Sequence, residues 1–171
     1  MLIEDILAIY INDHDKLMRF INWVIDEVQN SLKDAERPRV LLALTQINLY
    51  HRMLECLLYR MQNLIALSRD QESQALQGTI VPDQARTAEL IRKVKSDIKK
   101  LTEKYEDRMD KHYMLFLFQI YQYVDGVKAT CEKLNLRLQL LNFYISQNLP
   151  DRVLEVCKGT GIQMASIAAH N

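Results

Sequence analysis

Residues 91–105 read IRKVKSDIKKLTEKY, and apolar side chains recur in this stretch at alternating steps of three and four residues. This rhythm places them on one side of an α-helix, as in helices that pack along their length. A second run with the same rhythm contains Val127, Cys131, Leu134, Leu138, Leu141 and Ile145. Between the two runs, residues 113–124 read YMLFLFQIYQYV and are apolar on nearly every side. The region from Pro82 to Asn148 is therefore predicted to form the buried centre of an all-helical protein.

The composition of the 171-residue chain favours the same fold class. Apolar residues make up 49% and charged residues 26%, which is typical of a soluble globular or helical protein. Four glycines and three prolines are too few for the turns of an all-β fold. We predict an all-α fold of long antiparallel helices, arranged as a four-helix-bundle or coiled-coil-like domain with a short C-terminal helix. The length predicts a single domain over residues 1–171, and no internal repeat is evident in the sequence.

Proline, glycine and capping residues give the expected helix bounds. The first helix is predicted over about residues 2–35, and Asp13 interrupts its apolar side. This interruption indicates either a break near residues 12–15, with Asp13 or Asp15 capping a second helix, or a polar notch in one helix. The second helix is predicted over about 39–77, between Pro38 and Gly78.

The remaining helical stretch is predicted over about 82–148, followed by a short helix over about 150–158. A turn between Glu106 and His112 would produce an up-down-up-down bundle. A continuous helix would instead be about 100 Å long, and its overhang would pair with another subunit. Gly126 is an alternative position for a kink. The tail after Gly161 either adds a last helical turn or frays.

Charge and cysteine usage limit the class of protein. The net charge is zero, but the charged residues are unevenly placed. Arg86–Lys104 holds seven basic and three acidic residues, whereas residues 1–36 hold eight acidic and three basic residues. This division indicates helix faces that match one another, or a basic strip offered to phosphates. Three widely spaced cysteines, without a CxxC motif, are expected to be buried thiols in a reducing compartment. An acidic N-terminus and short apolar runs predict a soluble, cytoplasmic protein.

We find no signature of catalysis, cofactor binding or metal binding in the sequence. The Glu-x-x-His motif of di-metal bundles is absent, because Ile11, Asn48 and Met109 stand three residues before the histidines. His51 lies on the apolar side of the second helix, so we interpret it as a partly buried core residue. Phosphotransfer or another enzymatic role through His51 ranks third among the possible functions. Cys131 is interpreted as a core thiol.

Two groups of residues are candidates for binding a partner. The first is an aromatic cluster with more rings than one helix of a simple bundle buries. It predicts that some of the rings meet a partner or another subunit, while core packing within one chain accounts for the larger share. Its members are Tyr113, Phe116, Phe118, Tyr121 and Tyr123. The second group is a basic strip, for which solvated bases opposite an apolar side are the ordinary explanation and membrane attachment is the alternative. Its members are Arg92, Lys93, Lys99, Lys100 and Lys104.

The predicted function is therefore a non-enzymatic helical protein-interaction module that self-associates through apolar helix faces. Such a module would serve as an adaptor, scaffold, chaperone or assembly subunit, with protein partners and a homo-oligomeric state. The alternative is a peripheral membrane-binding domain that uses the strip Arg92–Lys104. Nucleic acid is not expected as a partner.

Overall fold

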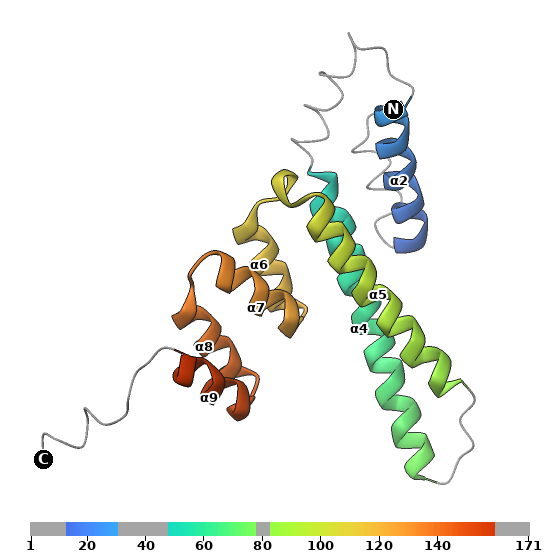
Figure 1. The fold of residues 1–171 in the computed structure, drawn as a ribbon. Helices are drawn as coiled ribbons and strands as arrows, with labels where there is room; N and C mark the ends of the chain where they lie inside the picture. Colours follow the sequence, from blue (N-terminus) through green and yellow to red (C-terminus); the bar gives the residue numbers. More distant parts are fainter. Residues whose placement is uncertain (1–12, 31–47, 78–82, 160–171) are drawn as a thin grey trace, which may run out of the picture. The chain divides into compact units, whose positions relative to one another are not determined.

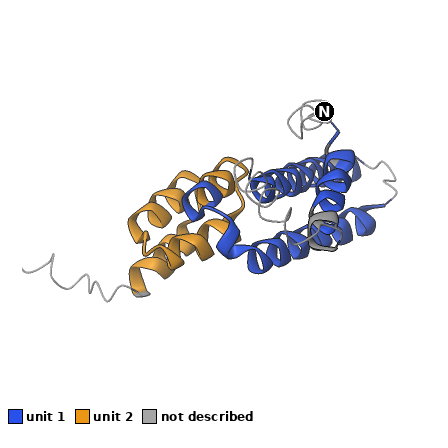
Figure 2. Ribbon diagram, turned by 90° about the horizontal axis from the view of Figure 1, so that it is seen from above, with its two compact units in different colours: residues 1–114 blue, residues 115–171 orange. Residues whose placement is uncertain are grey.

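The computed structural model describes residues 13–30, 48–77 and 83–159, and every regular element within these ranges is helical. The predicted all-α class is therefore confirmed. The chain divides into two compact units, Met1–Met114 (unit 1) and Leu115–Asn171 (unit 2), where the sequence indicated one domain (Figure 2).

Among the residues that the structure describes, unit 1 contains the long helices α2 (His14–Asn30), α4 (Leu49–Leu76) and α5 (Gln84–Lys104). Helices α4 and α5 lie side by side and run in opposite directions (Figure 1). At one end of the pair, the Gln84 side chain donates a hydrogen bond to the Gln71 carbonyl at 3.4 Å. At the other end, the rings of Tyr50 and Tyr105 lie 4.5 Å apart.

Each helix of unit 1 contributes aliphatic residues at helical spacing to one apolar core. The buried residues at this spacing include Leu17, Ile21 and Val24 of α2, Leu54, Leu58 and Met61 of α4, and Val94, Ile98 and Leu101 of α5. Burying one such side chain contributes about 1.5–3 kcal/mol of favourable transfer free energy. The apolar rhythm of residues 91–105 therefore marks a true core face.

Asp13 caps the first described helix. Its carboxylate accepts a hydrogen bond from the Lys16 backbone N–H at 3.1 Å and pairs with the Lys16 ammonium at 2.8 Å. The hydrogen bonds from Lys16 lower the pKa of Asp13. Asp13 is thus a helix cap, one of the two roles that the sequence left open. The predicted helical segments 2–12, 31–35 and 39–47, the link 78–82 and the C-terminal tail lie outside the described residues.

The predicted helical stretch 82–148 is divided at several points. Helix α5 ends at Lys104, a 3₁₀ turn follows at Glu106–Arg108, and Met109 is extended and buried. The next helix begins at Lys111, and Asp110 caps it by accepting the Tyr113 N–H at 2.7 Å. The polar segment 106–112 therefore does contain a turn, held by a buried methionine and an aspartate cap without glycine or proline.

Residues 111–159 form an array of four short helices with a constant period. They are α6 (Lys111–Ile120), α7 (Val124–Lys133), α8 (Arg137–Ser146) and α9 (Pro150–Gly159). Each helix has ten residues and begins thirteen residues after the previous one. Helix α7 packs against α8, and α8 against α9. The sequence analysis did not foresee this regular spacing of helices, and Gly126 lies inside α7 rather than at a kink.

Three segments connect these helices, namely residues 121–123, 134–136 and 147–149. These connectors share one backbone geometry. Gln122, Asn135 and Asn148 have φ values of 50°, 56° and 53°. The residue after each of them donates its N–H to a carbonyl five residues earlier, at 2.8, 2.8 and 3.0 Å. This is the closure of a helix by a left-handed residue. Asparagine tolerates that conformation better than most residues other than glycine.

Gln122 is the connector residue whose side chain suits this conformation least. Replacing Gln122 with glycine is expected to stabilise unit 2 by about 0.5–1 kcal/mol, because the steric cost of positive φ disappears and exceeds the added entropy of the unfolded chain. The matched control Gln119→Gly lies inside α6 and is expected to cost about 0.5–1 kcal/mol. Urea unfolding read by hydrogen exchange of unit 2 peptides measures both changes. A loss of stability in Gln122→Gly would contradict the assignment.

Candidate functional site: the surface of the helical array

The structure divides the predicted aromatic cluster. The ring of Tyr113 lies 4.6 Å from that of His51, within unit 1. Phe118 is buried and packs edge-on against Tyr123, with ring centroids 5.5 Å apart. Tyr121 is partly exposed, and Phe116 is more than half exposed. Phe118 is thus a core residue of the array, and Phe116 is the most exposed member of the cluster.

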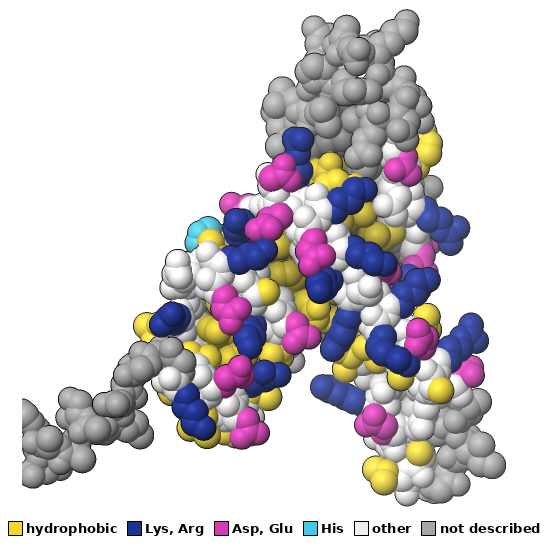
Figure 3. Space-filling model, viewed as in Figure 1, with side chains coloured by type: hydrophobic (Ala, Val, Ile, Leu, Met, Phe, Trp, Pro, Cys, Tyr) yellow, Lys and Arg dark blue, Asp and Glu magenta, His cyan; other side chains and the backbone are white. Residues whose placement is uncertain are grey.

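The largest exposed apolar side chains of the array were mostly outside that cluster. More than half of the side-chain surface is exposed in Phe116, Ile120, Leu138, Ile145 and Leu154. Figure 3 shows apolar surface between charged groups over the region of these helices. Sequence reasoning missed Leu138 and Ile145 as surface residues because it placed them on the apolar side of one long helix.

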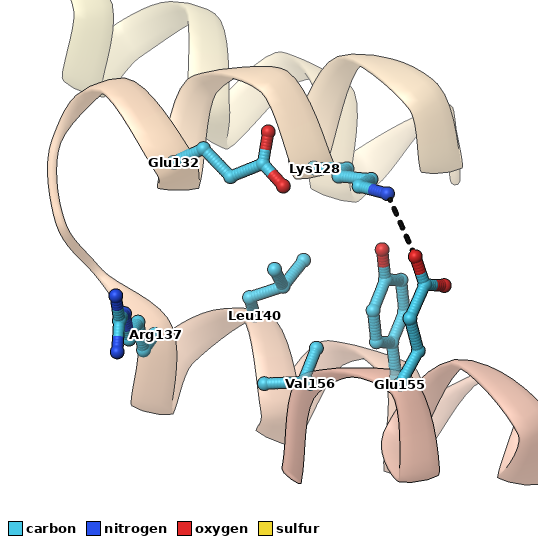
Figure 4. A pocket seen from close by; sticks show the side chains of 7 residues that line it. Lys128, Glu132, Arg137, Leu140, Glu155 and Val156 are labelled. Carbon is cyan, nitrogen blue, oxygen red and sulfur yellow. Dashed lines mark hydrogen bonds and ion pairs between the residues drawn. The ribbon is translucent and has the colours of Figure 1, made fainter. Parts of the chain in front are cut away.

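Helices α7, α8 and α9 together line a pocket of about 210 Å³. Leu140, Tyr144 and Val156 supply its apolar lining, and Lys128, Glu132, Arg137 and Glu155 supply its charged groups (Figure 4). The Lys128 ammonium lies 3.3 Å from one Glu155 oxygen, and Arg152 lies 3.1 Å from the other. Hydrogen bonds from Arg152 and Lys128 lower the pKa of Glu155. The negative charge of Glu155 is therefore balanced by two cations at the pocket's edge.

A second hollow of about 140 Å³ shares Glu132, Arg137 and Leu140 with the first and adds Cys131 and Asn135. Pockets that enclose cofactors or drug-sized ligands usually measure about 300–1,000 Å³. Each hollow is smaller than that range and suits one side chain of a partner. An apolar lining with a charged edge is also the usual anatomy of a protein interface.

The predicted basic strip lies on α5, where all five of its residues are exposed. Arg92 pairs with Glu89 at 2.8 Å, and Lys99 lies 3.8 Å from Glu103. The Lys104 ammonium lies 5.0 Å from the centre of the Tyr105 ring. The positive charge of the strip is therefore offset in part by neighbours on the same helix, as expected for a solvated helix face.

His51 is buried and joins α4 to the segment that leads into α6. Its Nε2 atom accepts the Asp110 backbone N–H at 2.9 Å, and its own backbone N–H is bound by the Asn48 carboxamide at 3.2 Å. An acceptor role requires the lone pair of Nε2, so the ring is neutral in this arrangement. Burial lowers the pKa of His51, while the Asp110 carboxylate opposes the decrease. These contacts match the core role predicted for His51.

Two of the three cysteines match the predicted core thiols. Cys56 and Cys131 are buried, whereas Cys157 is exposed. Burial raises the pKa of Cys56 to about 11 and also raises that of Cys131. Both buried thiols are therefore protonated at neutral pH, which disfavours nucleophilic attack. Within the described residues, no three histidine, cysteine, aspartate or glutamate side chains gather as a metal site would require.

Comparison with known proteins gives no match to a family model, to a curated protein or to a solved structure. In the described ranges, the helices are too short or too polar to cross a membrane.

Proposed function

We propose that this protein is a non-enzymatic helical interaction module that binds a protein partner through the array α6–α9 and also self-associates. The observation that carries the proposal is the set of large apolar side chains exposed along the array, from Ile120 on α6 to Leu154 on α9. Exposed apolar surface with a polar surround is typical of protein-binding sites. Tandem short repeats present extended surfaces that repeat proteins use for binding.

The two hollows beside α8 support the same proposal. Each has room for one partner side chain, and the larger one combines apolar walls with the Lys128–Glu155 ion pair. A partner that inserts an aliphatic or aromatic anchor would displace water from Leu140 and Val156 while keeping the charged groups solvated. Buried anchors of this kind supply most of the binding free energy in many interfaces.

Quantitative affinity capture from the source cells tests the proposal. The tagged full chain is compared with Ile120→Asp and Leu154→Asp, which place a charge on exposed apolar positions, and with Ala129→Asp, which adds the same charge at an exposed position of α7 that carries no large apolar side chain. We expect at least one protein to be captured by the wild type and Ala129→Asp, but at least tenfold less by Ile120→Asp or Leu154→Asp. Tenfold corresponds to about 1.4 kcal/mol of binding free energy. Identical captured sets for all four chains would refute the proposal.

A further inference from the structure

The thirteen-residue period lets corresponding positions of the four short helices be compared directly. The second and ninth positions are exposed in these helices, except for the partly exposed Gln119, and they are polar in three of the four helices. They are His112 and Gln119 in α6, Asp125 and Glu132 in α7, and Asp151 and Lys158 in α9. In α8, the same positions hold Leu138 and Ile145. Since the array is built without apolar residues at these positions elsewhere, packing within the array does not account for those of α8.

Leu138 and Ile145 form one continuous row along α8. They are 71% and 59% exposed, and Leu141, which lies between them on the same side, is partly exposed. Spacings of three and four residues align the three side chains along about two helical turns. We call Leu138, Leu141 and Ile145 the α8 row. Helix α8 carries one charged residue, Arg137, and the exposed neighbours Asn142 and Ser146 are uncharged.

We propose that the α8 row is the contact between two copies of this chain, which pair their α8 helices antiparallel about a twofold axis near Leu141. In this arrangement Leu138 of one copy packs against Ile145 of the other, and each row meets its own reversed copy, as an isologous interface requires. The inference rests on the proposed function and names the surface through which self-association occurs.

Charge is the reason for choosing a second copy as the occupant. Apart from Arg137 at its start, the row is flanked on α8 by the uncharged residues Asn142 and Ser146. It therefore offers little complementary charge to a strongly acidic or basic partner helix, whereas two such rows meet without strong repulsion. Arg137 lies in the first turn of α8, at the positive end of its own helix dipole. Antiparallel pairing brings Arg137 near the negative end of the partner's α8, where a cation is stabilised.

The size of the row determines how tightly the copies hold together. Stable interfaces use about 20–30 residues on each side, and three aliphatic side chains with their neighbours are far fewer. The dimer should therefore be weak, with a dissociation constant on the order of 10–100 µM. Self-association should accordingly be absent in dilute solution and pronounced at high concentration.

Sedimentation equilibrium of the full chain between about 5 and 500 µM tests the proposal, because these concentrations span the expected dissociation constant. The mean mass should rise from that of one 20.1 kDa chain towards twice that value. Leu138→Glu combined with Ile145→Glu should weaken the dimer at least tenfold. Leu138→Glu combined with Ile145→Lys should restore it, because antiparallel pairing places opposite charges in contact. The exposed α9 substitution Leu154→Glu should leave the mass unchanged.

A wild-type chain that stays monomeric at 500 µM would overturn the proposal, as would a dimer that survives Leu138→Glu with Ile145→Glu. Failure of the opposite-charge pair to restore the dimer, with both double variants folded by circular dichroism, would overturn the antiparallel arrangement. These outcomes are separable from the proposed function. The capture experiment uses no substitution on α8, so a partner lost there is lost whether or not α8 pairs.

Discussion

Replacing Gly126 with valine is expected to destabilise unit 2 by about 3 kcal/mol, because the added atoms overfill a closed contact. A Cβ atom at this position would lie 2.6 Å from Tyr123 Cδ1 and 2.7 Å from Phe118 Cγ. Cγ is bonded to the side chain's own Cβ, so it cannot move away without shifting α6 or changing the Phe118 rotamer. Phe118 is buried, and its ring already packs against that of Tyr123. Gly126 is therefore the point at which α7 approaches α6.

The matched control is Ala129→Val on the exposed side of the same helix. It adds a β-branched side chain without a clash. Because valine has a lower helix propensity than alanine, the substitution is expected to lower the free energy of unfolding by about 0.6 kcal/mol. Denaturant unfolding monitored by hydrogen exchange of unit 2 peptides measures both variants. Phe118→Ala should remove most of the clash, so its combination with Gly126→Val should cost clearly less than the two single changes added together. Equal costs for Gly126→Val and Ala129→Val would contradict this packing.

Replacing His51 with alanine is expected to destabilise unit 1 by about 3 kcal/mol. The substitution removes a buried ring that packs against Tyr113, and it leaves the Asp110 N–H without its acceptor. His51→Gln keeps a polar side chain of related length and should lose about half as much. His112→Ala is the matched control, because His112 is exposed at the start of α6, and it should change stability by less than about 0.5 kcal/mol.

Hydrogen exchange of peptides covering α4 and residues 109–114 provides the measurement for the His51 variants. If His51→Ala and His112→Ala have the same stability, His51 does not hold the turn after α5. The pH dependence supplies a second test. The pKa of His51 in the folded protein is lowered from 6.5, so the unfolded chain binds the proton more readily. The stabilisation by neutral His51 is complete above about pH 6.5 and is lost as the pH falls towards the folded pKa.

The difference in unfolding free energy between the wild type and His51→Gln isolates this effect from other titrating groups. It should be smaller at pH 5.5 than at pH 7.5, because only the wild type loses the neutral imidazole on acidification. A difference that is constant over this range would show that His51 titrates alike in the folded and unfolded chain.

Much of unit 1 follows from its sequence. The spacing of Val94, Ile98 and Leu101 identified a core face that the structure confirms, and Asp13 was a candidate cap before its bond to Lys16 was known. These features are local, because side chains three or four residues apart share a helix face and a cap acts on the next turn. The helix bounds after residue 104 were harder to predict, because Asp110 and Met109 act through contacts with Tyr113 and the core.

The array could not be predicted from the apolar rhythm alone. The run from Val127 to Ile145 suggested one continuous helix, yet Leu134 lies in a connector and Leu138 points to solvent. The breaks carry no glycine or proline, and Gln122 is an unusual residue at positive φ. A signal for the repeat was nevertheless present. Apolar residues follow Gln122, Asn135, Asn148 and Gly161 at intervals of thirteen, although such short segments share little else.

Because the connectors with a left-handed residue are local structures, the array could be lengthened or shortened by one helix and its connector. Each connector is closed by hydrogen bonds that reach back no more than five residues, so its geometry does not depend on distant parts of the chain. Duplicating residues 124–136 would insert a complete helix with its connector and leave every later side chain facing as before. Inserting twelve or fourteen residues would rotate the following faces by about 100° and turn core residues towards solvent. We therefore expect this part of the gene to tolerate insertions and deletions best in units of thirty-nine bases, a far stricter condition than preservation of the reading frame.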